Sequence, residues 1–264
     1  MKIMTKNKNG FRLLAIVYLA LAVFISGCVT TNGDGAKTEK KVTSNKDKAD
    51  IYAQLASGYM KNEQFETAQS ELKKALAISP DHSQSNYMMG LLLIETEQYD
   101  EVEKFMSKAV QVDPQNSAAA HDLGSFLCQT GQELRSVIYF DKAVNNPYFK
   151  RPELSLMRAG ECLNKAGQPK KAEEYLKKSL AINARLKPSL FNLAKIKYDA
   201  ASYLSARAYI ERLFAITKPQ PASLLLGYQI ESKLKADDVA SQYRTRLLER
   251  FPASDQARSL RTRR

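Results

Sequence analysis

The chain of 264 residues contains few of the residue types from which most catalytic and metal sites are built. It has two histidines and three cysteines, and neither type shows the ligand spacing that a zinc or transition-metal site needs. A glycine-rich loop that could hold phosphate groups is also absent from the sequence. We therefore predict neither a metal centre nor a nucleotide site, and no cofactor beyond a covalent lipid.

Glycine and proline are scarce as well, with 11 and 9 residues, whereas 44% of all residues are hydrophobic. This composition allows one large or two small domains with a true apolar core. The net charge of +12 falls to +8 when residues 1–27 are removed. Because the other basic residues are scattered or terminal, no nucleic-acid surface is predicted. The basic segment 255–264 is expected to extend the last helix or to fray, with its arginine cluster a solvated tail that contacts anionic lipid or cell wall at most.

The N-terminus has the pattern of a secretory signal. A basic segment, residues 1–12, precedes an apolar run of 13 residues, 13–25, and the small residues Ser26 and Gly27 follow. The apolar run is shorter than the roughly 20 residues that span a bilayer as a helix. These features predict a signal peptide over residues 1–27, with an uncleaved anchor as the alternative.

The five residues from Phe24 to Cys28 resemble the lipobox of bacterial lipoproteins. This resemblance implies cleavage after Gly27, lipidation of Cys28 and a stable membrane anchor built from several acyl chains. Val29 stands where retention in the inner membrane typically requires Asp. The expected location is therefore the periplasmic face of the outer membrane.

Two cysteines remain once Cys28 carries lipid. An even number in an oxidising compartment favours a disulfide between Cys128 and Cys162, and two buried free thiols are the alternative. A loop of 34 residues closed in this way would stabilise the fold by roughly 3–4 kcal/mol. Residues 28–48 are polar and lack helical periodicity, so they are expected to form a flexible tether.

From Ala49 onward the sequence repeats with a period close to 34 residues. A small residue after an apolar one recurs with spacings of 34, 34, 36, 34 and 33 residues, at Ala56, Gly90, Gly124, Gly160, Ala194 and Gly227. A second set of positions, occupied by small residues, and a third set, occupied by apolar residues, recur with the same spacings. Such a period is typical of the tetratricopeptide repeat, in which small residues let two helices cross closely and stacked units bury each other's apolar faces.

The predicted fold is therefore an all-α tetratricopeptide superhelix of six helix-turn-helix units over residues 49–254. The units are assigned to 49–82, 83–116, 117–152, 153–186, 187–219 and 220–254.

In such a superhelix the first helix of each unit faces a concave groove. The repeat phase assigns a largely apolar set to this groove, although each member could instead pack in the core: Met60, Tyr87, Leu91, Ile94, His121, Cys128, Leu154, Met157, Phe191, Tyr198, Leu224 and Tyr228. A continuous apolar strip indicates a binding site for protein, presented as an amphipathic helix or an extended segment. No small-molecule substrate is predicted.

His121 and Cys128 lie seven residues apart on one predicted helix and could imitate a thiol–base pair. No third orienting residue and no nucleophile elbow accompany them. A periplasmic thiol enzyme is thus an alternative from another class, and the chain is not expected to be an enzyme.

The middle of the chain is more specific than a generic repeat. It combines the stretch 124–131, the junction motifs Asn146-Pro147-Tyr148 and Arg151-Pro152-Glu153, and the stretch 159–162. With the lipobox and residues 223–227, these motifs resemble the PilF/PilW family of type IV pilus lipoproteins, the pilotins, and the second and third cysteines match the family's pattern. His121-Asp122 and residues 135–137 depart from that pattern, which leaves partner details near the third unit in doubt.

Membership would imply a scaffold that binds secretin subunits, localises or assembles the secretin ring through which pili emerge, and supports twitching motility. The alternative is a repeat lipoprotein that serves outer-membrane protein assembly or cell-wall enzymes.

Overall fold

The computed structural model describes residues 44–262, all of them in helices, turns and loops. The predicted signal peptide, the cleavage site after Gly27, the lipidated Cys28 and most of the tether lie outside the described residues, as do Arg263 and Arg264.

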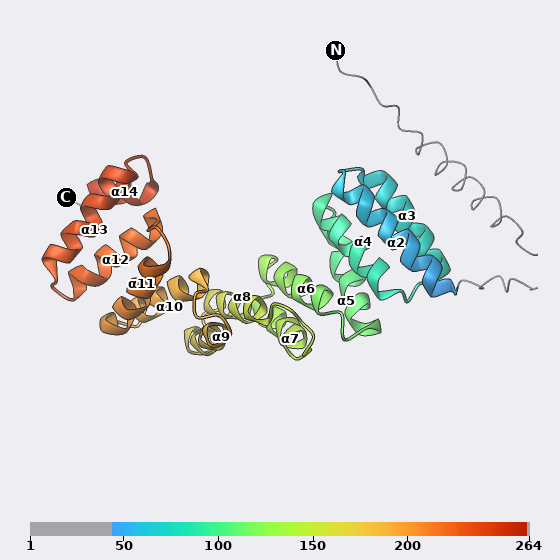
Figure 1. Ribbon diagram of the computed structural model, residues 1–264, viewed down its shortest axis with the longest axis horizontal. Helices are drawn as coiled ribbons and strands as arrows, with labels where there is room; N and C mark the ends of the chain where they lie inside the picture. The colour runs from blue at the N-terminus through green and yellow to red at the C-terminus, as the bar shows by residue number, and fades with distance from the viewer. Residues whose placement is uncertain (1–43, 263–264) are drawn as a thin grey trace, which may run out of the picture. The chain divides into compact units, whose positions relative to one another are not determined.

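Within the described residues the chain forms six consecutive helix pairs and one further helix, so the all-α repeat fold is confirmed (Figure 1). The pairs are α2 (Asn45–Lys61) with α3 (Phe65–Ile78), α4 (Ser83–Glu95) with α5 (Val102–Val112), α6 (Ser117–Gln129) with α7 (Glu133–Val144), α8 (Pro152–Lys165) with α9 (Pro169–Ile182), α10 (Lys187–Asp199) with α11 (Tyr203–Ile216), and α12 (Pro221–Lys233) with α13 (Asp237–Arg250). A short 3₁₀ helix, η1 (Tyr99–Glu101), precedes α5, and α14 (Asp255–Thr262) follows the last pair.

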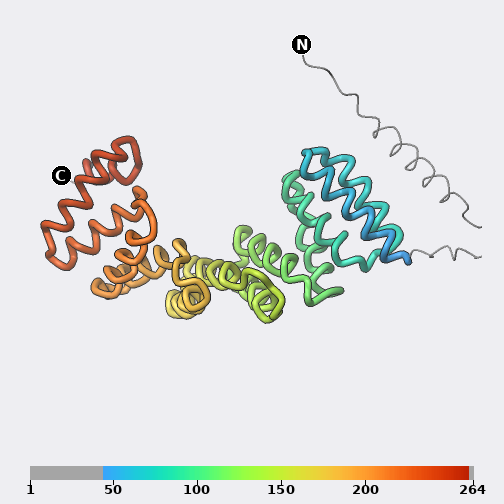
Figure 2. The backbone as a smooth tube through the Cα atoms, in the orientation of Figure 1, coloured from blue at the N-terminus to red at the C-terminus, as the bar shows by residue number. Residues whose placement is uncertain are grey.

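The pairs stack in chain order, as the backbone tube in Figure 2 shows. First helices of successive units touch each other, as in α6 with α8, α8 with α10 and α10 with α12, whereas no pair of second helices packs comparably in residues 44–262. A stack that is tighter on the side of the first helices curves toward that side. The first helices therefore form the inner layer of the array.

Small residues at the helix crossings explain the repeat period. A Cβ atom added to Gly160 would lie 2.6 Å from Cγ of Leu176 and 3.1 Å from the carbonyl oxygen of Ala172. The corresponding atom on Gly124 would lie 3.0 Å from the ring of Phe140. Because Leu176 and Phe140 are fully buried, each glycine lets a large side chain of the second helix fill the centre of its unit.

A left-handed residue in the turn between the two helices also recurs in every unit. The six residues have φ between 56° and 85°, and only two of them are glycine: Glu63, Glu97, Gly131, Gly167, Ala201 and Lys235. This conformation reverses the chain within three residues. The column is not visible in the sequence, because its side chains share no chemical property.

Both ends of the repeat region differ from the prediction. Helix α2 begins at Asn45, inside the segment expected to be tether, because Ser44 and Asp47 form a capping box with two 3.0 Å hydrogen bonds. At the other end, residues 255–262 are not a solvated tail. They form α14, whose Ala257 and Leu260 are buried with Leu224 and Leu247.

Candidate protein-binding surface

Most residues predicted for the groove lie on the inner layer and are half-buried. They pack with one side against the core and leave part of their surface to solvent: Met60, Tyr87, Leu91, Ile94, His121, Cys128, Leu154, Phe191, Tyr198 and Tyr228. The repeat phase places them on the first helices as expected.

Two residues of the predicted groove belong to the core instead. Leu224 is 1% exposed, because α14 and α13 pack over it. Met157 is 7% exposed and packs among the buried residues of the fourth and fifth units. Both assignments were wrong, since the repeat phase gives the direction of a side chain but not what packs against it.

Polar side chains join neighbouring first helices along the same layer. The hydroxyl of Tyr87 on α4 donates a 2.6 Å hydrogen bond to Asp122 on α6, and burial together with that carboxylate raises the pKa of Tyr87. His121 on α6 lies 2.7 Å from the hydroxyl of Ser155 on α8. Burial lowers the pKa of His121 below 6.5, against the opposing effect of Asp122 and with the help of Arg158. These contacts join adjacent units, and the lowered pKa leaves the imidazole of His121 neutral at pH 7.

An open cleft of about 320 Å³ lies between α10 and α12, where their inner faces meet. Its walls are mainly apolar, with an ion pair between Lys195 and Asp199 (2.9 Å) at the rim. The residues that line it are Phe191, Lys195, Tyr198, Asp199, Ala222, Leu225, Leu226, Gln229 and Gln256. Phe191 and Tyr198 were predicted to bind a partner. The others were missed, because a cleft between two helices depends on how those helices pack.

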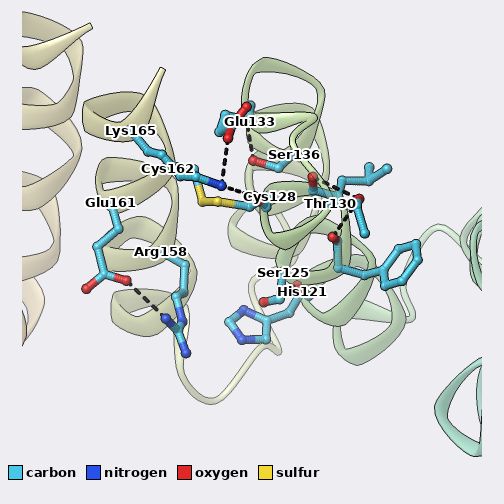
Figure 3. Close-up of a disulfide and its surroundings, with 12 residues drawn as sticks. His121, Ser125, Cys128, Thr130, Glu133, Ser136, Arg158, Glu161, Cys162 and Lys165 are labelled. Atoms are coloured by element: carbon cyan, nitrogen blue, oxygen red, sulfur yellow. Dashed lines mark hydrogen bonds and ion pairs between the residues drawn. A yellow bond between two sulfur atoms is a disulfide. The ribbon is translucent and has the colours of Figure 1, made fainter. Parts of the chain in front are cut away.

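Cys128 and Cys162 form a disulfide between α6 and α8, with 5.9 Å between their Cα atoms (Figure 3). Beside it, Lys165 donates a 3.0 Å hydrogen bond to the carbonyl oxygen of Cys128 and forms a 2.8 Å ion pair with Glu133. This pairing lowers the pKa of the Glu133 carboxyl. The disulfide joins the third unit to the fourth at the junction where the repeat is two residues longer, and it leaves Cys128 without a free thiol in this structure.

One arrangement has the composition of a catalytic triad. His82 lies 3.0 Å from Asp50 and 2.7 Å from the hydroxyl of Ser85. However, Ser85 is fully buried, and the ring of His82 accepts a hydrogen bond from the Ser85 amide as the cap of α4. The arrangement therefore fixes the start of a helix and exposes no nucleophile.

Residues 44–262 also contain no group of three or more His, Cys, Asp and Glu side chains that could hold a metal ion. None of the helices in this part of the chain is both long and apolar enough to cross a membrane. The inner layer and its cleft hold most of the residues that the repeat phase assigned to partner binding.

Comparisons with known proteins agree with this architecture. Two family models of the tetratricopeptide repeat match residues 59–125 and 155–185. The type IV pilus assembly protein PilF of Pseudomonas aeruginosa is 28% identical over 242 residues, which cover 91% of this chain and 94% of that protein.

Two solved structures have the same arrangement of helices. The crystal structure of PilW, described as a widely conserved type IV pilus biogenesis factor, superposes with a TM-score of 0.67 at 27% identity, covering 80% of this chain and 97% of that one. A structure of Pseudomonas aeruginosa PilF gives a TM-score of 0.68 at 23% identity, covering 83% and 99%.

Proposed function

Because the chain belongs to the tetratricopeptide-repeat proteins of type IV pilus biogenesis, we propose that it acts as a pilotin. In this role it is an outer-membrane lipoprotein that binds secretin subunits of the pilus system. It localises and assembles the secretin ring, and the cell needs it for pilus biogenesis and twitching motility.

The observation that carries this proposal is the similarity to PilF, which extends over nearly the whole length of both chains. If the two proteins shared only a common repeat module, the match would cover single units and not nearly the whole of both chains. The lipobox residues that end in Cys28, which the sequence places directly before the tether, support the outer-membrane anchor.

The mechanism follows from having an anchor and a binding surface on one chain. Lipid on Cys28 would fix the N-terminus in the membrane, and the inner layer of first helices would hold a secretin segment near it. Half-buried aromatic and aliphatic side chains such as Tyr87, Leu91 and Phe191 already pack on one side. They therefore lose little conformational freedom when a partner covers their other side.

Two variants of the full chain test the proposal in the native cell. Cys28→Ala removes the lipid site, and Val29→Asp keeps it but introduces the residue associated with inner-membrane retention. We expect both proteins to retain the helical circular dichroism of the wild type and to leave the outer-membrane fraction. Secretin multimers and twitching should be lost or strongly reduced in both strains.

Normal secretin multimers in the Cys28→Ala strain would contradict the anchoring mechanism. Photo-crosslinking from Tyr87 and Leu91 identifies the partner independently. Capture of barrel-assembly proteins or cell-wall enzymes in place of secretin would establish the alternative scaffold.

A further inference from the structure

Charge divides the described repeat array into two halves of opposite sign. Residues 44–149 contain nine Lys and Arg against fifteen Asp and Glu, a net charge of −6. Residues 150–262 contain twenty-two Lys and Arg against eleven Asp and Glu, a net charge of +11. The change of sign falls at the junction that the disulfide between Cys128 and Cys162 spans.

The apolar cleft between α10 and α12 lies within the basic half. Several lysines on or beside these two helices are exposed and make no ion pair within the described residues: Lys187, Lys218 and Lys233. At the rim itself, Lys195 and Asp199 pair with each other while both remain about half exposed. An acidic group that approaches the cleft therefore meets one lysine that can change partners, and the helices that form the cleft carry further exposed lysines.

We propose that this cleft is a docking site for an acidic segment of a partner protein, which inserts an apolar side chain between Phe191, Tyr198 and Leu225. The volume of about 320 Å³ is suited to one large or two small side chains. Lys195 would pair with a carboxylate of the segment beside the inserted side chain. The inference rests on the proposed function, because both require that the inner layer hold a protein.

The acidic half makes the site directional. Residues 44–149 repel an acidic segment and residues 150–262 attract it, so the segment is guided to the C-terminal units and away from the N-terminal ones. Repulsion between like charges disfavours binding of the acidic segment to the N-terminal units. One partner chain could in this way be aligned along the array by charge before any apolar contact forms.

Two labelled peptides of 15 residues test the site by fluorescence anisotropy with the full-length chain in a non-ionic detergent. They share the same Phe and Leu positions on one helical face and differ only in polar residues, Glu in one peptide and Lys in the other. Ala222→Trp fills the cleft from an exposed position on α12. Its matched control is Ala208→Trp, the same change at an exposed position of α11.

We expect the Glu peptide to bind at least about tenfold more tightly than the Lys peptide at low salt, and to weaken as salt screens the charges. Ala222→Trp should weaken it by about tenfold or more, and Ala208→Trp by less than about twofold. Lys195→Glu should weaken binding more than Lys170→Glu, which reverses a charge that is also exposed but lies away from the cleft on α9.

Equal binding of the two peptides, or equal loss in the two Trp variants, would overturn the proposal. So would salt-sensitive self-association that Ala222→Trp abolishes, measured by sedimentation, because the occupant would then be the acidic half of a second copy. The two proposals can fail separately. If the peptide experiments overturn the cleft assignment while cells that express Ala222→Trp still form normal secretin multimers, the pilotin role stands without this cleft.

Discussion

The guanidinium of Arg207 on α11 donates two hydrogen bonds to the carboxylate of Glu231 on α12, which is 2% exposed. The pair joins the second helix of the fifth unit to the first helix of the sixth. Glu231 is the least exposed partner of any ion pair within the described residues. Its carboxylate depends on Arg207 for compensation of its charge.

Replacing Arg207 with Ala leaves this buried carboxylate without its partner. We expect the free energy of unfolding to fall by about 1–3 kcal/mol, because the desolvation of Glu231 is no longer offset. Arg135→Ala is the control, since Arg135 and Glu103 form a more exposed pair whose loss should lower the free energy of unfolding by less than the loss of Arg207 does. Urea denaturation of both variants measures the difference, and equal losses would show that Arg207 acts as a surface residue.

Removal of the disulfide should lower the free energy of unfolding by roughly 3–4 kcal/mol, since the unfolded chain loses a closed loop of 34 residues. The variant is Cys128→Ser with Cys162→Ser, and the measurement is chemical denaturation with and without a reducing agent. The reductant should destabilise the wild type and leave the double variant unchanged. A wild type insensitive to reductant under denaturing conditions would contradict this stabilisation.

Two glycines in helices should respond in opposite directions to the same change. Gly160→Ala places a methyl group 2.6 Å from Leu176 and against a backbone oxygen, so we expect a loss of about 1–3 kcal/mol from overpacking. Gly58→Ala meets no atom within 4 Å and should stabilise α2 by about 0.5–1 kcal/mol. Thermal unfolding of the two variants decides whether close crossing, rather than helix propensity, requires glycine at position 160.

Ala201 adopts φ of 56°, a conformation that costs a residue with a Cβ atom roughly 1–2 kcal/mol. Ala201→Gly should therefore be neutral or stabilising by up to about 1 kcal/mol. The same change at Ala208, inside α11 and exposed, should destabilise by about 1 kcal/mol. A destabilised Ala201→Gly protein, measured by its thermal midpoint, would mean that the methyl group makes a contact that outweighs the strain.

The lowered pKa of His121 predicts a loss of stability in mild acid. Below pH 6.5 the unfolded imidazole takes up a proton while the folded one, buried beside Arg158, resists it. The free energy of unfolding therefore begins to fall near pH 6.5 and continues to fall until the pH reaches the folded pKa. His121→Gln should remove this part of the pH dependence, as urea midpoints at pH 7.5 and 5.5 would reveal. If the urea midpoint changed equally between the two pH values in both proteins, His121 would not be the source of this pH dependence.

The repeat fold could be predicted because a few columns of residue size determine it. Small residues such as Gly160 and large ones such as Leu176 must alternate in register wherever two helices cross. Helix α14 was expected only as an extension of the last repeat helix or as a frayed end. Among residues 255–261 only Ala257 and Leu260 are buried, and four arginines among the last seven residues of the chain hide that pattern.

The binding surface was less predictable, for reasons of packing. Position in the repeat indicated that Leu224 faces inward, but not that α14 lies over it. The cleft likewise combines side chains of α10 and α12 with Gln256 of α14, three segments whose contacts appear only once the chain is folded.

The position of α14 sets a practical limit on where the chain can be shortened. A protein that ends at residue 254 would contain six complete repeats, and the periodicity would recommend it as a minimal fragment. It would also bring the side chains of Leu224 and Leu247 into contact with water and remove Gln256 from the cleft. A crystallisable or soluble fragment of this protein should therefore extend to at least residue 262.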